Sequence, residues 1–544
     1  MPKETSHTHK RPFLTPGMIL IVLMVFAIAV RVAIASTRLM IQLDETAYVR
    51  IAENLIAGRG YFDITGMEGS QYFPLFPLVI AALAIVLNDY VLAGYVTVIA
   101  FGTLIMIPTY LLGKELVGER VGLMAAGLVA VMPLLVDYSS RLYSENVYVF
   151  FLMMAVYYGW MLLKNNSIAW GVLTGLSLGI AYLANPSTLI YVVAFATLLV
   201  AVGFKKHTLF RMAGLAAILV MCFALFGVPF SFFVHNVSGK WTYSSKSGAG
   251  NIYNTNHGLE YGTLAWEKDV FSLTPDGKTI HLAKINEEAK GPLGTIIESP
   301  GQSAQNFVKM SKKFFSKSFA VVMPPWLLPL LALGVFNMAR DRNRFLKAAY
   351  LLLMISPALI ILIMDYRSRF FYPFLPLLMI WVAEGWSGIE KWMKGLFSPP
   401  TDETRMMALP KLVPWLMTAV IIGPLLLLTF GINMTRSYDT ESREAGEWLK
   451  QQYGVGKRVA NRQYTVAYYA GDDSVAIPYA DLESTTIYLR EKDADFLVIG
   501  RQEILDWRPQ YASLLDGQAD HLGWNLINIL YPDSSREILI FELS

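Results

Sequence analysis

Cysteine is almost absent from this chain of 544 residues, and charged side chains are scarce. The single cysteine, Cys222, lies in an apolar run, which excludes a disulfide framework and a thiolate metal site. Only 16% of the residues are charged, whereas 54% are hydrophobic and the mean hydropathy is +0.43. A soluble protein of this length would be far more polar, so the composition predicts a polytopic α-helical membrane protein.

Further absences narrow the class of function. The net charge of +3 is too small to indicate a nucleic-acid partner. The sequence has no glycine-rich nucleotide loop, because Gly454-Val455-Gly456 precedes an expected strand instead of following one. No spacing of His, Asp and Glu specifies a metal site, so no cofactor is predicted. A divalent metal would be compatible with the acidic residues but is not indicated.

Apolar runs long enough to cross a bilayer recur along most of the chain. We expect about eleven spans, near residues 18–36, 91–113, 120–136, 146–163, 168–184, 188–204, 211–234, 319–338, 346–364, 371–388 and 411–433. Lys and Arg gather in alternate loops, as at residues 205–211 and 340–347, and mark those loops as cytoplasmic. The loops near residues 37–90, 137–145, 235–318 and 365–372 then share the outer face.

One apolar segment, residues 73–87, does not fit this alternation of loops. It is short and begins with Pro74 and Pro77, so we interpret it as an interfacial or re-entrant helix. Just before it, Glu45–Ala57 has helical periodicity and is expected to lie along the membrane surface. The first outer loop is therefore predicted to contain interfacial helices.

The composition changes after the last predicted span. Residues 437–544 have the alternating pattern of a soluble domain, while residues 1–436 form the transmembrane domain. In the soluble part we expect a helix at Glu441–Gln452 and strands at Arg458–Ala460, Asp495–Ile499, Trp524–Ile529 and Glu537–Glu542. This pattern predicts a small α/β domain on the outer side of the membrane.

Acidic residues gather at the mouths of two predicted spans on the outer face. Asp44 and Glu45 follow the first span directly, and adjacent carboxylates beside lipid are costly unless they bind or react. Glu145 begins a later span, and Asp137 and Arg141 lie in the loop before it. Solvated helix starts, where the helix dipole favours acids, remain the alternative explanation.

Two arginines lie in the predicted outer turn at residues 365–372. Arg presents a planar fork of donors to phosphate oxygens, and a tyrosine adds a hydroxyl, so Arg367, Arg369 and Tyr372 suit an anionic headgroup. Anchoring at the membrane interface is the alternative.

The long outer loop from Val234 to Gly262 is rich in Asn, Gly, Ser, Tyr and Trp. Amide, hydroxyl and aromatic groups commonly contact sugar rings, although a solvated loop has a similar composition. The candidate substrate-binding residues are Tyr48, Tyr72, Asp137, Arg141, His235, Asn254, Asn256 and His257.

Several motifs together carry a resemblance to a known family. They are DETAY after the first span, GRGYF and YFPLFPLVIAAL, LYSENVY, the Gly-Asn pair of the long loop, and RSRFFYPFLPLL. On these motifs the chain resembles the GT-C superfamily of integral-membrane glycosyltransferases, and within it the branch of protein O-mannosyltransferases and the lipid A aminoarabinose transferase. The resemblance implies a polyprenyl-phosphate-linked sugar donor and an active site on the extracytoplasmic side of the plasma (inner) membrane.

The resemblance and the outer acids together suggest an inverting glycosyltransferase. Asp44 would act as general base on an acceptor hydroxyl of a glycan, lipid or protein, with Glu45 and Glu145 as orienting or alternative acids. Arg369 and Tyr372 would stabilise the leaving phosphate. The alternative is a transporter or flippase of lipid-linked sugars, which usually carries ionisable groups near the membrane midplane.

The sequence departs from the family pattern at one place. The mannosyl and aminoarabinose branches often have a basic residue just before the proline pair, where this chain has Ser70-Gln71-Tyr72-Phe73-Pro74. Part of the contact with the donor phosphate is therefore expected from Arg369, Arg367 or Lys246. The departure also leaves the sugar and the acceptor undetermined.

Overall fold

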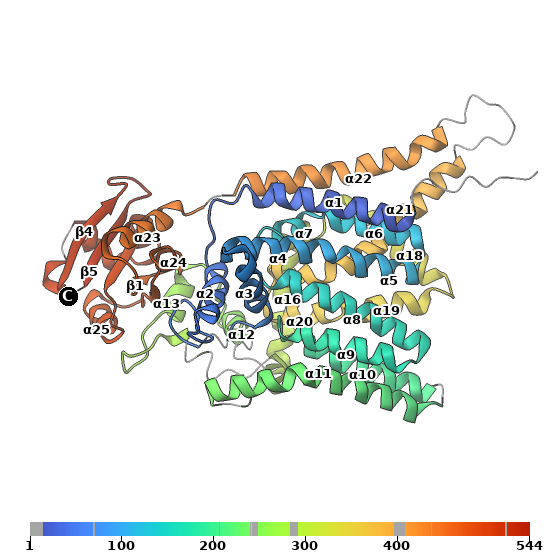
Figure 1. Ribbon diagram of the computed structural model, residues 1–544, viewed down its shortest axis with the longest axis horizontal. Helices are drawn as coiled ribbons and strands as arrows, with labels where there is room; N and C mark the ends of the chain where they lie inside the picture. Colours follow the sequence, from blue (N-terminus) through green and yellow to red (C-terminus); the bar gives the residue numbers. More distant parts are fainter. Residues whose placement is uncertain are drawn as a thin grey trace, which may run out of the picture.

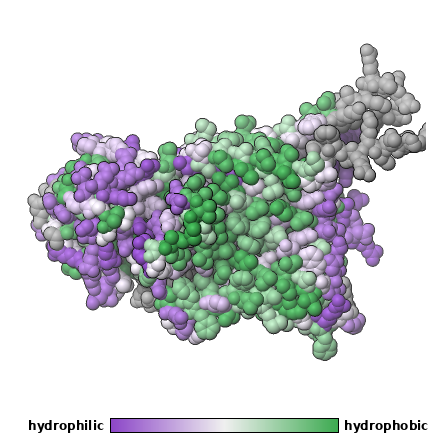
Figure 2. Space-filling model, in the orientation of Figure 1, coloured by the Kyte–Doolittle hydropathy of each residue, from purple (hydrophilic) through white to green (hydrophobic). Residues whose placement is uncertain are grey.

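The protein consists of a bundle of long helices with a smaller sheet-containing domain at one end (Figure 1). The computed structural model describes residues 15–68, 71–205, 207–239, 241, 249–282, 285, 292–396, 409–436, 438–516 and 519–543. On the face seen in Figure 2, hydrophobic surface covers the middle of the bundle between two more polar ends.

Seven helices of the described chain are long and apolar enough to cross a membrane, or eight if one bent pair of helices counts as a span. The seven are α1 (Pro16–Ala35), α4 with α5 (Tyr90–Leu104 and Met106–Leu116), α8 (Glu145–Asn165), α10 (Thr188–Lys205), α11 (Leu209–Ser238), α19 with α20 (Phe345–Ile355 and Pro357–Met364) and α22 (Leu409–Met434). The bent pair joins α16 (Pro300–Lys313), η1 (Phe314–Ser318) and α17 (Phe319–Val322) to η2 (Pro325–Leu327) and α18 (Leu328–Arg340) at 84°. The chain is thus a multi-pass membrane protein.

The remaining predicted spans coincide with helices that are shorter, interrupted or charged. Pro133 separates α6 (Glu119–Val131) from α7 (Pro133–Tyr138), and α9 (Ile168–Tyr182) has 15 residues. Helix α21 (Leu375–Leu396) contains the buried acids Glu384 and Glu390. The count of about eleven spans, and the side of the membrane that each loop faces, therefore stay predictions.

Two short helices occupy the first predicted outer loop, as the sequence indicated. They are α2 (Asp44–Ile56) and α3 (Leu75–Leu87), which pack on one another between the bundle and the sheet domain (Figure 1). A helix of 13 residues is about 20 Å long, which is too short to cross the hydrocarbon core of a bilayer. The length of α3 therefore agrees with an interfacial or re-entrant segment.

A buried arginine, which hydropathy alone overlooks, joins the first helix to the rest of the bundle. Arg31 of α1 is fully buried, and its Nε donates to Ser139 Oγ at 3.1 Å. In a continuous helix the carbonyl oxygen of Val129 would accept from residue 133, but Pro133 has no N–H. Arg31 supplies that missing donor. Its terminal nitrogens donate at 3.1–3.3 Å to the carbonyl oxygens of Ala27, Gly102, Val129 and Ala130.

The C-terminal domain is a five-stranded sheet flanked by helices. The strand order is β2-β1-β3-β5-β4, with β1 parallel to β2 and β3, and β5 antiparallel to β3 and β4. The strands are β1 (Arg458–Asn461), β2 (Asp473–Ala476), β3 (Phe496–Gly500), β4 (Trp524–Leu530) and β5 (Ile538–Leu543), and the helices are α23 (Thr440–Tyr453), α24 (Thr465–Ala470), α25 (Leu482–Glu491) and α26 (Arg501–Trp507), with η4 (Pro509–Asp516) and η5 (Asp520–Leu522). The predicted helix and strands are all present, whereas the edge strand β2 was not predicted.

The long loop after α11 docks on the sheet domain through an ion-pair cluster. The loop contains α12 (Ala249–Asn256), α13 (Leu264–Val270) and α15 (Pro292–Glu298). Glu267 of α13 is buried and accepts from Arg462 Nε and Nη2 at 2.8 and 2.6 Å, and it lies 3.5 Å from the fully buried Arg508. The Tyr479 N–H also donates to the Phe271 carbonyl at 2.7 Å.

We predict that Glu267→Gln loosens the sheet domain, because two arginines would lose the carboxylate that compensates their buried charge. Breaking one partner of a buried pair costs about 3–5 kcal/mol. The expected result is a lower thermal unfolding temperature in tryptophan fluorescence. The control is Glu447→Gln, whose exposed pair with Arg443 contributes no more than about 0.5 kcal/mol. Equal shifts in both variants would contradict the proposed docking role.

Candidate active site

Arg369 brings together three of the predicted motifs at the end of the bundle that faces the sheet domain. It lies in η3 (Ser368–Phe374), and its Nε donates to Glu145 Oε1 at 2.5 Å, while its Nη1 donates to Asp44 Oδ2 at 3.3 Å. The guanidinium also lies 4.7 Å from the centre of the Tyr143 ring. Burial lowers the pKa of Arg369, but Glu145 and Asp44 outweigh it and hold the pKa well above its ordinary value.

Asp44 is the accessible acid of this cluster. Its side chain is 27% exposed, compared with 9% for Glu145 and 1% for Glu45. The preceding residue, Leu43, has φ 55°, a conformation that leucine rarely adopts. Such backbone strain persists where the surrounding structure fixes it, often beside functional groups.

Glu145 is buried at the N-terminus of α8, where the helix dipole favours its negative charge. One carboxylate oxygen accepts from Arg369, and the other, Oε2, is buried without a hydrogen-bond partner in the described part of the chain. A buried acceptor without a partner costs about 1–3 kcal/mol, and its presence in a native fold calls for an explanation. A ligand donor at this position would provide one.

Glu45 points to a different set of partners from its neighbour Asp44. Arg38 Nη2 donates to its two oxygens at 2.7 and 2.9 Å. The backbone N–H groups of Gln42 and Leu142 add bonds of 2.9 and 3.0 Å. Glu45 therefore fastens α2 to the loop before α8, and both of its oxygens are already bonded.

Tyr372 lies behind the acid cluster and is fully buried. Its hydroxyl donates to Asn146 Oδ1, and the Asn146 amide donates to the Tyr138 carbonyl at 2.7 Å. Ser139 Oγ lies 3.4 Å from the same Asn146 oxygen and accepts from Arg31. These bonds connect the buried arginine of α1 to the residue that follows Glu145.

The remaining predicted residues near the cluster are held by specific partners. Tyr48 and Tyr72 are buried with their rings edge to face at 5.2 Å, and the Tyr48 hydroxyl lies 3.3 Å from Ser144 Oγ. Arg141 Nη2 lies 3.0 Å from Asp137, which also accepts from Arg436 at the end of α22. Arg367 Nε donates to Asp365 at 2.9 Å, and its Nη2 donates to Asn251 at 3.2 Å.

The predicted residues of the long loop lie in and beside α12 and at the end of α11. The rings of His235 and Trp241 stack at 4.0 Å, as do those of His257 and Tyr253. Asn256 accepts from Asn306 at 2.6 Å, and Asn254 Oδ1 is buried without a hydrogen-bond partner among the described residues. Lys246, a predicted contact for the donor phosphate, lies outside the described residues.

Glu260, which the sequence did not single out, anchors this loop beside η3. It accepts from Lys317 Nζ at 2.7 Å, from the Tyr366 hydroxyl at 2.5 Å and from Lys313 Nζ at 3.3 Å. The bonds from Lys317 and Tyr366 lower the pKa of Glu260 to about 2. The neighbouring Tyr261 ring lies 5.2 Å from the Arg367 guanidinium. No local motif marks Glu260, because its partners follow it by 53 to 106 residues.

No group of three or more His, Cys, Asp or Glu side chains is placed to hold a metal ion within the ranges that the structure describes. The carboxylates of Asp44 and Glu145 share the charge of Arg369 instead.

Comparison with known proteins finds a family model that matches part of this chain. Residues 72–231 match the family model of dolichyl-phosphate-mannose-protein mannosyltransferases. No curated protein sequence matches the chain significantly.

Two solved structures share the fold over most of their length. The archaeal oligosaccharyltransferase AglB of Archaeoglobus fulgidus, in complex with an inhibitory peptide and a dolichol-phosphate, is 14% identical with a TM-score of 0.62, over 95% of this chain and 73% of AglB. ArnT of Cupriavidus metallidurans, bound to undecaprenyl phosphate, is 10% identical with a TM-score of 0.56, over 96% of this chain and 97% of ArnT. The resemblance to the GT-C superfamily and to its O-mannosyltransferase and aminoarabinose transferase branch is confirmed, and the fold is GT-C-like.

We predict that Glu260→Gln releases the long loop. The folded-state pKa lies below the ordinary value of 4.5, so the carboxylate stabilises the anchored loop above pH 4.5. This contribution fades as the pH falls from 4.5 toward 2. The hydrogen-exchange protection factors of residues 249–262, which are corrected for the intrinsic rate at each pH, should be constant between pH 5 and 8 in the wild type and lower in the variant throughout. Glu447→Gln, whose exposed pair with Arg443 lies within α23 of the sheet domain, is the control, and protection unchanged by Glu260→Gln would contradict the anchoring role.

Proposed function

We propose that the protein is an inverting glycosyltransferase that moves a sugar from a polyprenyl-phosphate-linked donor to an acceptor hydroxyl. The observation that carries this proposal is the Arg369 guanidinium held between Asp44 and Glu145. Asp44 is exposed enough for an acceptor hydroxyl to reach it, and it lies beside the Arg369 guanidinium, which can bind a phosphate. The match to a mannosyltransferase family model, and the polyprenyl-type phosphates named for both structural neighbours, support the same donor class.

Asp44 is assigned the role of general base. It is the most exposed acid of the cluster, whereas both Glu45 oxygens are bonded to Arg38 and to backbone N–H groups. The acceptor oxygen would attack the anomeric carbon as its proton passes to Asp44. The bond between that carbon and the phosphate oxygen breaks on the opposite face, so the configuration at the sugar inverts.

Arg369 is assigned to the leaving phosphate, which gains negative charge as the bond breaks. A guanidinium presents five N–H groups, so it can contact carboxylates and phosphate oxygens together. Glu145 orients Arg369, and its buried Oε2 can accept a hydroxyl from the sugar or the acceptor. Arg367 and Tyr372 support η3 through Asp365, Asn251 and Asn146.

The proposed site faces the extracytoplasmic side of the plasma (inner) membrane. The distribution of Lys and Arg supports this orientation, because these residues gather in cytoplasmic loops of membrane proteins. In this chain they gather near residues 205–211 and 340–347, away from the proposed site. The long loop and the sheet domain would contribute the acceptor side, with Asn254, Asn256, His235 and His257 as candidate contacts. The group that accepts the sugar is a hydroxyl of a glycan, lipid or protein.

A transporter of lipid-linked sugars is the second candidate class. Transporters place ionisable groups along a path near the membrane midplane. Arg31 is a charged residue buried in the bundle, and it is fixed by five acceptors. The acids instead gather at one end of the bundle with Arg369, which favours the enzyme.

We predict that Asp44→Asn lowers the turnover number by roughly two to four orders of magnitude, because the amide cannot accept the acceptor's proton. Reconstituted protein would be given a radiolabelled polyprenyl-phosphate sugar, with transfer to an acceptor measured. Glu53→Gln on the same helix is the control for loss of a carboxylate and should retain activity. Wild-type turnover in a folded Asp44→Asn would exclude the base role, and movement of the donor across the bilayer without bond cleavage would support the transporter.

We predict that Arg369→Lys both weakens donor binding and lowers turnover, because lysine keeps the charge but loses the planar fork. Loss of a charge-assisted pair of bonds should reduce kcat/KM for the donor by roughly tenfold or more. Arg458→Lys, at an exposed pair with Asp493 in the sheet domain, is the control. Unchanged kinetics toward the lipid donor would remove Arg369 from the phosphate site.

A further inference from the structure

A cavity of about 520 Å³ lies at the opposite end of the bundle from Asp44 and Arg369. Helix α8 begins at Glu145 in the candidate active site and ends at Asn165, at the edge of this cavity. The 21 residues of α8 span about 30 Å, which is the thickness of the hydrocarbon core of a bilayer. The cavity is therefore distinct from the active site and lies near the other membrane surface.

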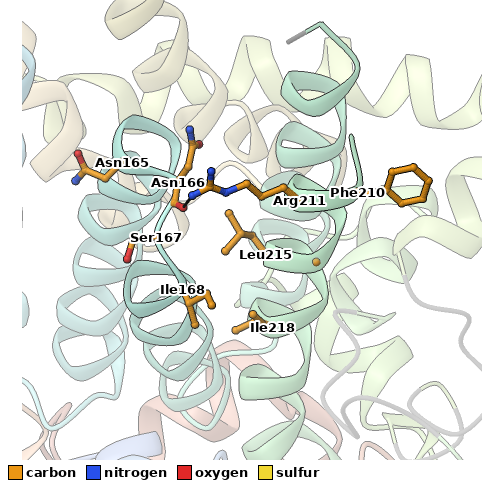
Figure 3. A pocket seen from close by; sticks show the side chains of 9 residues that line it. Asn165, Asn166, Ser167, Ile168, Phe210, Arg211, Leu215 and Ile218 are labelled. Atoms are coloured by element: carbon orange, nitrogen blue, oxygen red, sulfur yellow. Dashed lines mark hydrogen bonds between the residues drawn. The ribbon is translucent and has the colours of Figure 1, made fainter. Parts of the chain in front are cut away.

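The polar end of the cavity lies between the turn that joins α8 to α9 and the first turn of α11 (Figure 3). Arg211 reaches across this gap, and its Nη2 donates to the Asn166 carbonyl at 3.0 Å. The side-chain oxygen of Asn166, Oδ1, is buried and has no hydrogen-bond partner in the described chain. The cavity thus offers guanidinium donors beside one acceptor whose bonding capacity is unused.

The helix ends at this cavity also favour a negative charge. Ser167 and Thr208 stand directly before α9 and α11, and neither side chain caps the N-terminal N–H groups of its helix. The partial positive charge of a helix N-terminus adds to the full charge of Arg211. An anion in the cavity would therefore be stabilised from both sides.

The other end of the cavity is apolar and open. Leu215 and Ile218 follow Arg211 along α11 and line this part of the cavity (Figure 3). Ile168 and Phe210, in the first turns of α9 and α11, are 63% and 94% exposed. A Cβ atom added at Gly214, which also lines the cavity, would meet no atom within 4 Å. The groove therefore runs from a cationic end toward the hydrocarbon region.

We propose that this cavity binds a glycerophospholipid of the adjacent leaflet, with its phosphate on Arg211 and an acyl chain in the groove above Gly214. A headgroup with a hydroxyl or ammonium donor, as in phosphatidylglycerol or phosphatidylethanolamine, also satisfies Asn166 Oδ1. The cavity volume lies in the range of small-molecule sites, which suits a headgroup and its glycerol. This lipid site is independent of the proposed glycosyl transfer.

Native mass spectrometry of the full-length protein in detergent tests the proposal with three probes: phosphatidylglycerol, diacylglycerol and inorganic phosphate. We expect phosphatidylglycerol to bind the wild type and to bind Arg211→Ala about tenfold more weakly, because a charge-assisted contact is lost. Arg340→Ala is the matched control, since it removes one exposed positive charge at the end of α18. It should bind the lipid as the wild type does.

Gly214→Leu tests the acyl-chain groove separately. The added side chain enters open space, so the variant should fold, and it should weaken phosphatidylglycerol binding while leaving Arg211 intact. Thermal unfolding of the lipid-free variants verifies that they are folded. Equal binding of diacylglycerol, or equal lipid loss in Arg211→Ala and Arg340→Ala, would overturn the phosphate contact. Inorganic phosphate binding as tightly as the lipid would make this a soluble-anion site, and full binding by Gly214→Leu would remove the groove.

Discussion

The charge of Arg369 is the interaction on which the outer end of the bundle depends. Its two carboxylate partners, Asp44 and Glu145, begin helices α2 and α8, so one guanidinium fixes the starts of two helices against η3. Loss of either acid or of the arginine would leave charge largely withdrawn from water and uncompensated. Each of the three groups therefore compensates the charge of the others, and together they form the proposed active site.

The two adjacent acids beside this interaction, Asp44 and Glu45, have different partners and different exposure to solvent. Both carboxylate oxygens of Glu45 accept hydrogen bonds from Arg38 or from backbone N–H groups, whereas the side chain of Asp44 is partly exposed to solvent. The division follows from helix geometry, because consecutive residues of a helix point in directions about 100° apart. A buried structural acid can thus hold α2 in place while its neighbour faces the candidate site.

Much of this organisation could be predicted from local sequence. Apolar runs identified the long helices, and motifs at their ends identified Asp44, Glu145 and Arg369, because charges at a span boundary stand out against lipid-compatible neighbours. The partners of Glu45, Glu260 and Glu267 could not be predicted in this way. Glu267, for example, pairs with Arg462, which is 195 residues away, and no local pattern encodes a contact at that distance.

The contacts of Arg31 show how such distant partners bear on the synthesis and membrane insertion of the protein. The helix that carries it leaves the ribosome before α4, α6 and α7, and four of its five acceptors are made 71 to 108 residues later. A guanidinium alone in a bilayer is costly, so the burial of Arg31 depends on acceptors from α4, α6 and the end of α7. Because the chain is made from α1 toward α7, the stable insertion of α1 is coupled to the insertion of the helices that supply these acceptors.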